Sequence, residues 1–60
     1  MRTGDKLYTT VNGVEYLVTA IDAVYRKGIV LMVQDLTHSV YINDGFRTLS
    51  QFRSAAKKGF

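Results

Sequence analysis

The side chains that could do chemistry in this chain are mostly cations, and they gather towards its C-terminal end. The 60 residues carry eight Lys and Arg against five Asp and Glu, which gives a formal net charge of +3. Residues 47–60 contain no acidic side chain and four basic ones, which are Arg47, Arg53, Lys57 and Lys58. Such a cluster can neutralise phosphates, and the released counterions give affinity for nucleic acid without base selectivity. Arg26 and Lys27 add a second basic pair on a predicted turn.

The same cluster allows two other interpretations. Lys57 and Lys58 stand at the predicted end of a helix, where the helix dipole favours cations without any partner. A run of like charge is also often a solvated face, or a surface for an acidic protein partner. A structural role, nucleic acid and an acidic protein therefore all stay open at this point.

The single histidine, His38, lies in a predicted loop beside Asp35 and Ser39. A catalytic triad needs a nucleophile, a base and an orienting group, and a metal site needs three or four ligands. The neighbouring polar residues are ordinary turn formers whose side chains bond the local backbone. We therefore interpret His38 as a surface loop residue and expect no catalytic residue, metal site or cofactor.

Four tyrosines, Tyr8, Tyr16, Tyr25 and Tyr41, lie on predicted strands or at their ends. Aromatic side chains on a sheet can form a platform on which unpaired bases stack. They also fill the half-buried faces of small β proteins. Because neither side of the segment 14–21 is clearly polar, the pattern does not expose a platform, and we predict that most tyrosines pack in the core or at its rim.

Turn residues divide the rest of the chain into strands. The pair Asn12-Gly13 between two segments rich in Tyr, Thr and Val predicts a hairpin with a two-residue type I′ turn. A bulge or bend is expected at 21–23, and the unbroken apolar run 29–33 predicts a central strand covered on both faces. The predicted strands span about 6–11, 14–25, 29–34 and 39–42.

The final segment changes to a helical period. Leu49, Phe52 and Ala56 form an apolar stripe, which predicts a helix over about 49–58. Thr48 and Gln51 match a capping box at its start. Gly59 is placed for a left-handed C-cap, and Phe60 for the apolar contact that accompanies such a cap.

Length and composition bound the class of protein. A chain of 60 residues without cysteine leaves room for one domain, residues 1–60, with a small core and no disulfide framework. No window reaches the roughly 18 consecutive apolar residues of a membrane span, and the first residues open no secretory signal. We expect a cytoplasmic protein that is neither an enzyme nor bound to a membrane.

Three short motifs resemble those of a known class of module. Gly4-Asp5-Lys6-Leu7, Tyr16-Leu17-Val18 and Gly28-Ile29-Val30 are similar to the opening strands of small SH3-like or Tudor-like barrels. Leu49-Ser50-Gln51-Phe52 looks like the closing segment of short prophage-encoded proteins of unknown function. The order of strands and helix is also similar to the carbon-storage-regulator family of RNA-binding dimers. This chain departs from the Gly-Val-x-Ala-Pro stretch of that family because it has no proline, and only Arg47 stands near the helix start.

These observations predict a mainly β fold, either a small SH3-like barrel or a strongly bent antiparallel sheet with a short C-terminal helix. The leading functional hypothesis is a non-enzymatic module that binds nucleic acid by phosphate neutralisation rather than base readout. This hypothesis assigns phosphate binding to the four basic residues of 47–60, with assistance from Arg26 and Lys27. The alternative is a protein-interaction module, a phage or host regulator or inhibitor, that acts through a sheet edge or the helix. A homodimer that swaps a strand or the helix fits either function.

Overall fold

The structure is a computed structural model that describes residues 2–23, 27–42 and 45–60. Arg26, Tyr25 and the predicted end of the second strand at 24–25 lie outside the described residues.

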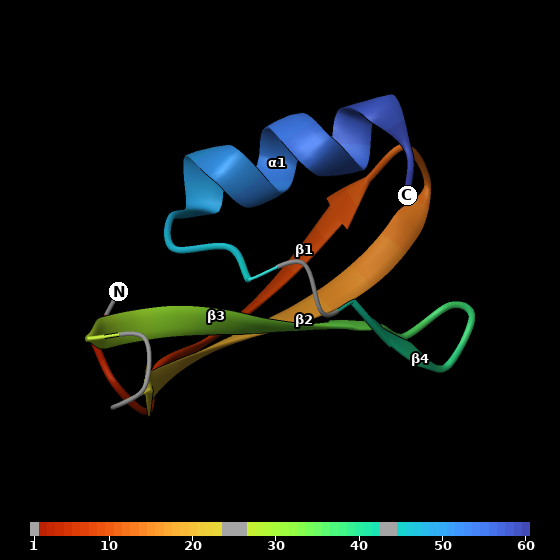
Figure 1. The fold of residues 1–60 in the computed structure, drawn as a ribbon. Coiled ribbons are helices and arrows are strands. Elements are labelled where there is room, and N and C mark those ends of the chain that lie inside the picture. Colours follow the sequence, from red (N-terminus) through yellow and green to blue (C-terminus); the bar gives the residue numbers. More distant parts are fainter. Residues whose placement is uncertain (1, 24–26, 43–44) are drawn as a thin grey trace.

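Four strands follow one another in a single antiparallel sheet of order β1-β2-β3-β4 (Figure 1). Their bounds are β1 Lys6–Val11, β2 Val14–Ala23, β3 Gly28–Asp35 and β4 Val40–Ile42, and the helix α1 spans Leu49–Lys58. The helix lies across one face of the curled sheet (Figure 1). The mainly β fold is confirmed, and the sheet is open, with β1 and β4 as its edges.

The first hairpin has the predicted geometry. Asn12 and Gly13 have φ values of 52° and 77°, and a type I′ turn needs a positive φ at both positions. The pairing of β1 with β2 continues without a break from Lys6 opposite Thr19 to the residues beside the turn. Local turn chemistry therefore sets the register of this half of the sheet.

β3 is the central strand that the sequence predicts, since it pairs with β2 on one side and with β4 on the other. The register with β2 runs unbroken from Tyr16 opposite Asp35 to Ala23 opposite Gly28. The predicted bulge at 21–23 is therefore wrong, and the bend is spread along the curling strands (Figure 1). Ser39 falls outside β4 and has a φ of 56°, which is far from extended backbone.

The core lies between the helix and one face of the sheet. Alternate residues of β2 and β3 point to this face because successive side chains of a strand alternate. Phe52 is completely buried, and its ring packs edge-on against Tyr16 at a centroid distance of 5.1 Å. The core cluster consists of Val11, Tyr16, Val18, Ala20, Leu31, Val33, Phe46, Phe52 and Ala56.

Both ends of α1 are capped. Thr48 and Gln51 form the predicted capping box, in which the Gln51 N–H donates to the Thr48 hydroxyl at 3.1 Å. Gly59 has a φ of 90° and a ψ of 147°, so its φ is positive as predicted but its conformation is not left-handed helical. Phe60 folds back towards Tyr16, with ring centroids 6.0 Å apart. Within the described residues no helix has the length and apolar character to cross a membrane.

The second face of the sheet has no helix over it (Figure 1). On this face Met32 is 42% exposed but Val30, two residues earlier in β3, is buried, so the prediction that β3 is covered on both faces holds at Val30 and fails at Met32. A single ten-residue helix covers only one face of a four-stranded sheet, and periodicity within β3 does not reveal which face that is.

Candidate functional site

The predicted basic residues near the C-terminus form one exposed surface along α1. We call Arg47, Arg53, Lys57 and Lys58 the basic helix surface. All four side chains are exposed, and no acidic residue occurs between 45 and 60. Arg53, Lys57 and Lys58 belong to α1, which covers one face of the sheet, and Arg47 lies just before the helix.

Packing and caps fix the orientation of this surface. Burial of Phe52 and Ala56 against the sheet turns Arg53 and Lys57 outwards, and these two cations are neighbours one helical turn apart. At the C-terminal end of α1, the side-chain amide of Asn12 donates to the backbone carbonyl of Lys57 at 3.1 Å. The hairpin turn therefore holds the end of the helix that carries the two lysines.

The second predicted basic group is only partly described. Lys27 is exposed, with a φ of 54°, while Arg26 lies outside the described residues. A β-carbon at Gly28 would lie 3.8 Å from Nη1 of Arg47, so the start of the helix and the β2–β3 turn are adjacent. Cations thus lie near both ends of α1, with Lys27 and Arg47 near its start and Lys57 and Lys58 in its last turn.

The tyrosines divide between the two faces of the sheet. Tyr16 is buried in the core, but Tyr8 and Tyr41 are 66% and 59% exposed. The prediction that most tyrosines pack in the core or at its rim is therefore wrong for these two residues. The register places them in one row across the sheet, in which Leu17 and Gln34 stand between them.

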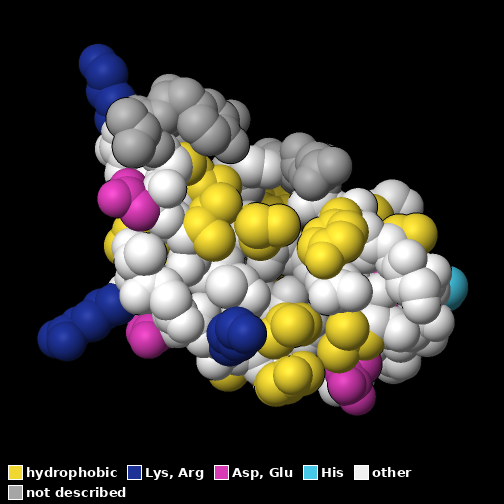
Figure 2. Space-filling view, turned by 90° about the horizontal axis from the view of Figure 1, so that it is seen from below, with side chains coloured by type: hydrophobic (Ala, Val, Ile, Leu, Met, Phe, Trp, Pro, Cys, Tyr) yellow, Lys and Arg dark blue, Asp and Glu magenta, His cyan; other side chains and the backbone are white. Residues whose placement is uncertain are grey.

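We call the side of the sheet turned away from the helix the open sheet face. Figure 2 shows that apolar side chains are prominent on this face, with charged ones among and around them. A shallow hollow of about 250 Å³ lies in it, lined by Lys6, Leu17, Thr19, Met32, Gln34 and Tyr41. This face was not predicted from the sequence, although every second residue of β1, Lys6, Tyr8 and Thr10, is exposed and signals it.

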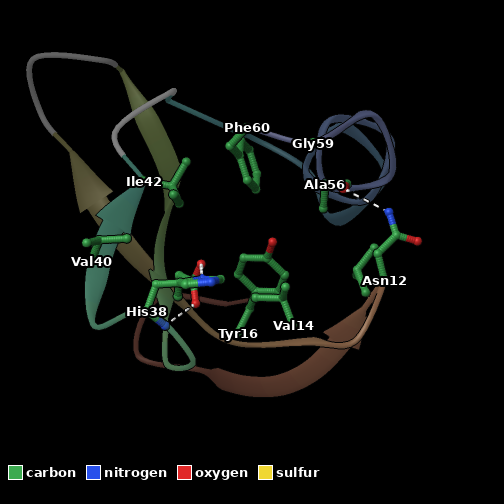
Figure 3. Close-up of a pocket in the computed structure, with 11 residues that line it drawn as sticks. Asn12, Val14, Tyr16, His38, Val40, Ile42, Ala56, Gly59 and Phe60 are labelled. Carbon is green, nitrogen blue, oxygen red and sulfur yellow. Dashed lines mark hydrogen bonds and ion pairs between the residues drawn. The ribbon is translucent and has the colours of Figure 1, made fainter.

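A larger pocket of about 350 Å³ opens between the hairpin turn, the end of α1 and β4 (Figure 3). Its walls are mostly apolar and include Val14, Val40, Ile42 and Phe60. The Tyr16 hydroxyl points into the pocket (Figure 3). Burial, and after it the negative charge of Asp35, raises the pKa of Tyr16, which keeps this hydroxyl protonated.

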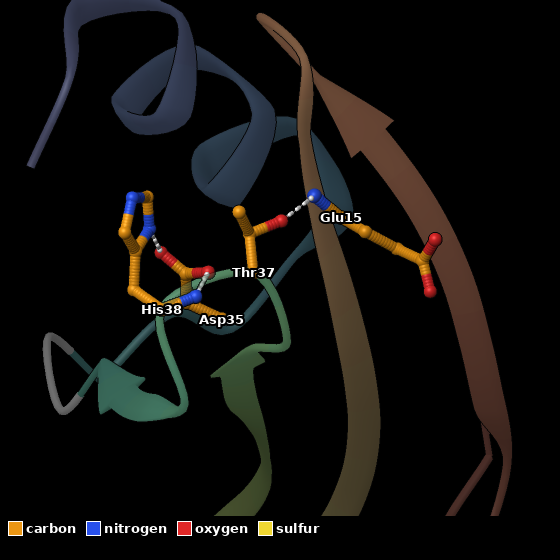
Figure 4. A network of polar contacts seen from close by, with 4 residues as sticks. All are labelled: Glu15, Asp35, Thr37 and His38. Carbon is orange, nitrogen blue, oxygen red and sulfur yellow. Dashed lines mark hydrogen bonds and ion pairs between the residues drawn. The ribbon is translucent and has the colours of Figure 1, made fainter.

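Asp35 and His38 form a polar pair at the edge of the pocket (Figure 4). One Asp35 carboxylate oxygen accepts the His38 backbone N–H at 2.9 Å, and the other lies 2.7 Å from Nδ1 of the imidazole. Burial raises the pKa of Asp35, but the hydrogen bonds from the His38 side chain and from the His38 and Thr37 backbones outweigh it and lower the pKa. This bonding to the local backbone confirms the turn-forming role predicted for Asp35.

The same loop is tied to the sheet by Thr37, whose hydroxyl accepts the Glu15 backbone N–H at 3.0 Å. The Glu15 carboxylate points away from this contact (Figure 4). In the described part of the chain, no three His, Cys, Asp or Glu side chains are grouped so that they could hold a metal ion. The two contacts between His38 and Asp35 are thus those of residues that order the loop after β3.

Comparison of the chain with protein-family models, with curated proteins and with solved structures found no match.

Proposed function

We propose that this chain is a cytoplasmic, non-enzymatic module that binds nucleic acid through the basic helix surface. The observation that supports this proposal is the exposure of Arg53, Lys57 and Lys58 on a helix whose orientation is fixed at both ends. The surrounding segment 45–60 has no carboxylate side chain that could neutralise them.

Phosphates are the chemical group that this surface would contact. Arg53, Lys57 and Lys58 lie along about 7.5 Å of helix, which corresponds to the rise of about two base pairs at 3.4 Å each. The surface presents hydroxyls of Ser50 and Ser54 beside the cations, which can donate to phosphate oxygens. We expect neutralisation of charge, with little preference among sequences.

Fluorescence anisotropy with labelled duplex DNA and single-stranded RNA tests the proposal. Three phosphate contacts predict a slope of about −2.7 for log affinity against log salt on duplex DNA, or about 40-fold weaker binding at 200 mM than at 50 mM salt. The double substitution Arg53→Glu with Lys57→Glu should abolish binding.

Arg2→Glu is the matched control for Arg53→Glu. Arg2 is also exposed, the change in net charge is the same, and the residue belongs to the N-terminal segment rather than to the helix. Equal losses of affinity in both variants would mean that only net charge matters, which contradicts the assignment to the helix. Absence of binding to either nucleic acid at low salt would contradict the proposal as a whole.

A second candidate function is supported by a separate observation. Among the described strands β1 pairs only with β2, so its outer edge is free to accept a strand from a partner protein. We expect the affinity for such a partner to resist salt. It should fall when the outer edge of β1 is blocked or when Phe60, which is 54% exposed beside the pocket, is removed.

A further inference from the structure

We infer that the open sheet face is a self-complementary surface on which a second copy of this chain docks face to face. This inference is independent of nucleic-acid binding, because the basic helix surface lies on the other side of the sheet. Three properties of the open sheet face indicate that a second copy binds there. They are its exposed apolar side chains, its area and the placement of its charges.

The face exposes several large apolar side chains. Tyr8, Met32 and Tyr41 are 66%, 42% and 59% exposed, and Leu17 stands half-buried between the two tyrosines. Figure 2 shows apolar side chains around the shallow hollow of this face. Two sheets that pack on each other at about 10 Å bury such side chains together.

The area suits a pair of chains. The molecule extends 32 × 19 × 17 Å, and a rectangle of the two longest extents has an area of about 600 Å², so two facing copies would bury at most about 1,200 Å² in total. That value is at the lower bound of standard specific interfaces, which bury about 1,200–2,000 Å². Most of this face must take part for such an interface to be stable.

The charges of the face complement those of a rotated copy. Lys6 and Glu15 point to the same side of the sheet, because alternate residues share a face and Thr10, four residues after Lys6, pairs with Glu15. Four residues of strand separate the two charges by about 13 Å, so they do not pair within one chain. The row of Tyr8 and Leu17 lies midway between them.

A two-fold axis along that central row brings opposite charges together. Rotation about this axis keeps each strand over its counterpart and reverses its direction, so Lys6 of one copy lies over the pair of Thr10 and Glu15 in the other. The symmetry repeats the contact, which gives two ion pairs flanking a central strip of tyrosines. Both α1 helices then lie on the outer sides of the dimer.

Charge-swap variants test this arrangement. Sedimentation equilibrium from about 1 to 500 µM should show a concentration-dependent dimer of the unmodified chain. Lys6→Glu and Glu15→Lys should each weaken the dimer at least about tenfold, because each places like charges opposite one another. The double variant, which exchanges the two charges, should restore the affinity to within about threefold of the original.

Controls separate the interface from the fold and from nucleic-acid binding. Arg53→Glu changes the charge on the helix side and should leave the dimer affinity unchanged. Tyr8→Asp should abolish the dimer while circular dichroism shows an intact fold, since this side chain is 66% exposed.

Three outcomes would overturn the inference. A chain that stays monomeric at the highest concentration does not use this face for a second copy. If Lys6→Glu and Glu15→Lys leave the dimer affinity unchanged, any dimer forms through another surface. A double variant as weak as the single ones would contradict the two-fold arrangement itself.

Discussion

At the scale of single residues, Asp35 shows how position changes chemistry. It is the buried acidic side chain of the described structure, and it keeps its charge because His38 and two backbone N–H groups hydrogen-bond to it. The same charge lies close enough to Tyr16 to raise the pKa of that phenol. The carboxylate at the end of β3 therefore adds to the effect of burial on the pKa of a phenol on the neighbouring strand.

The lowered pKa of Asp35 predicts a loss of stability in acid. Since the unfolded chain binds this proton more tightly than the folded one, the stabilisation is fully present above the ordinary pKa of 3.8 and is lost as the pH falls through the folded value. Urea unfolding as a function of pH should show this loss. Asp35→Asn should flatten the acid side of the profile, and profiles of equal slope would contradict the role of Asp35.

At the scale of elements, the hairpin turn and the helix act on one another through Asn12. This residue supplies the positive φ of the turn and also donates to the backbone carbonyl oxygens of Ala56 and Lys57. The last carbonyls of a helix have no partner within the helix, so such a donor stabilises its end. The cap thereby holds the two terminal lysines of the basic helix surface in place.

Two substitutions at Asn12 separate its role in the hairpin turn from its hydrogen bonds to the end of the helix. Asn12→Gly keeps the positive φ and removes only the side-chain hydrogen bonds, so we expect a loss of about 1 kcal/mol in the free energy of unfolding. Asn12→Ala also strains the turn and should cost about 2 kcal/mol. Chemical denaturation measures both values, and equal stabilities of the two variants would show that the left-handed backbone is not strained by alanine.

At the scale of the whole molecule, the fold depends on a few aromatic contacts. Phe52 contacts Tyr16 and Phe46 edge-on, and Phe60 stacks against it at a centroid distance of 6.4 Å. A domain of this length is stabilised by about 3–9 kcal/mol in total. One central ring therefore accounts for a large share of the stability.

Phe52→Ala should unfold most of the protein. Truncation of a fully buried phenylalanine costs about 3–5 kcal/mol, which approaches the total stability of such a domain. Phe60→Ala is the control, since that ring is 54% exposed and its loss should cost about 1 kcal/mol. Thermal unfolding followed by circular dichroism compares the two, and a cooperative transition near that of the original chain in Phe52→Ala would contradict the prediction.

The sequence by itself determined the parts of this protein that depend on neighbouring residues. The Asn12-Gly13 turn is local, and so is the helix 49–58 with its Thr48 and Gln51 cap, because the interactions that form them span four residues or fewer. The exposure of the basic residues in the helix follows from the same short-range period.

Only the tertiary structure decided which face of the sheet the helix covers. That choice buries Tyr16 and leaves Tyr8 and Tyr41 exposed, and it brings Asn12 to the end of a helix 44 residues away in the sequence. Each of these contacts joins segments far apart along the chain. Alternation within a strand shows that two faces exist, but the packing of the helix selects the one that becomes the core.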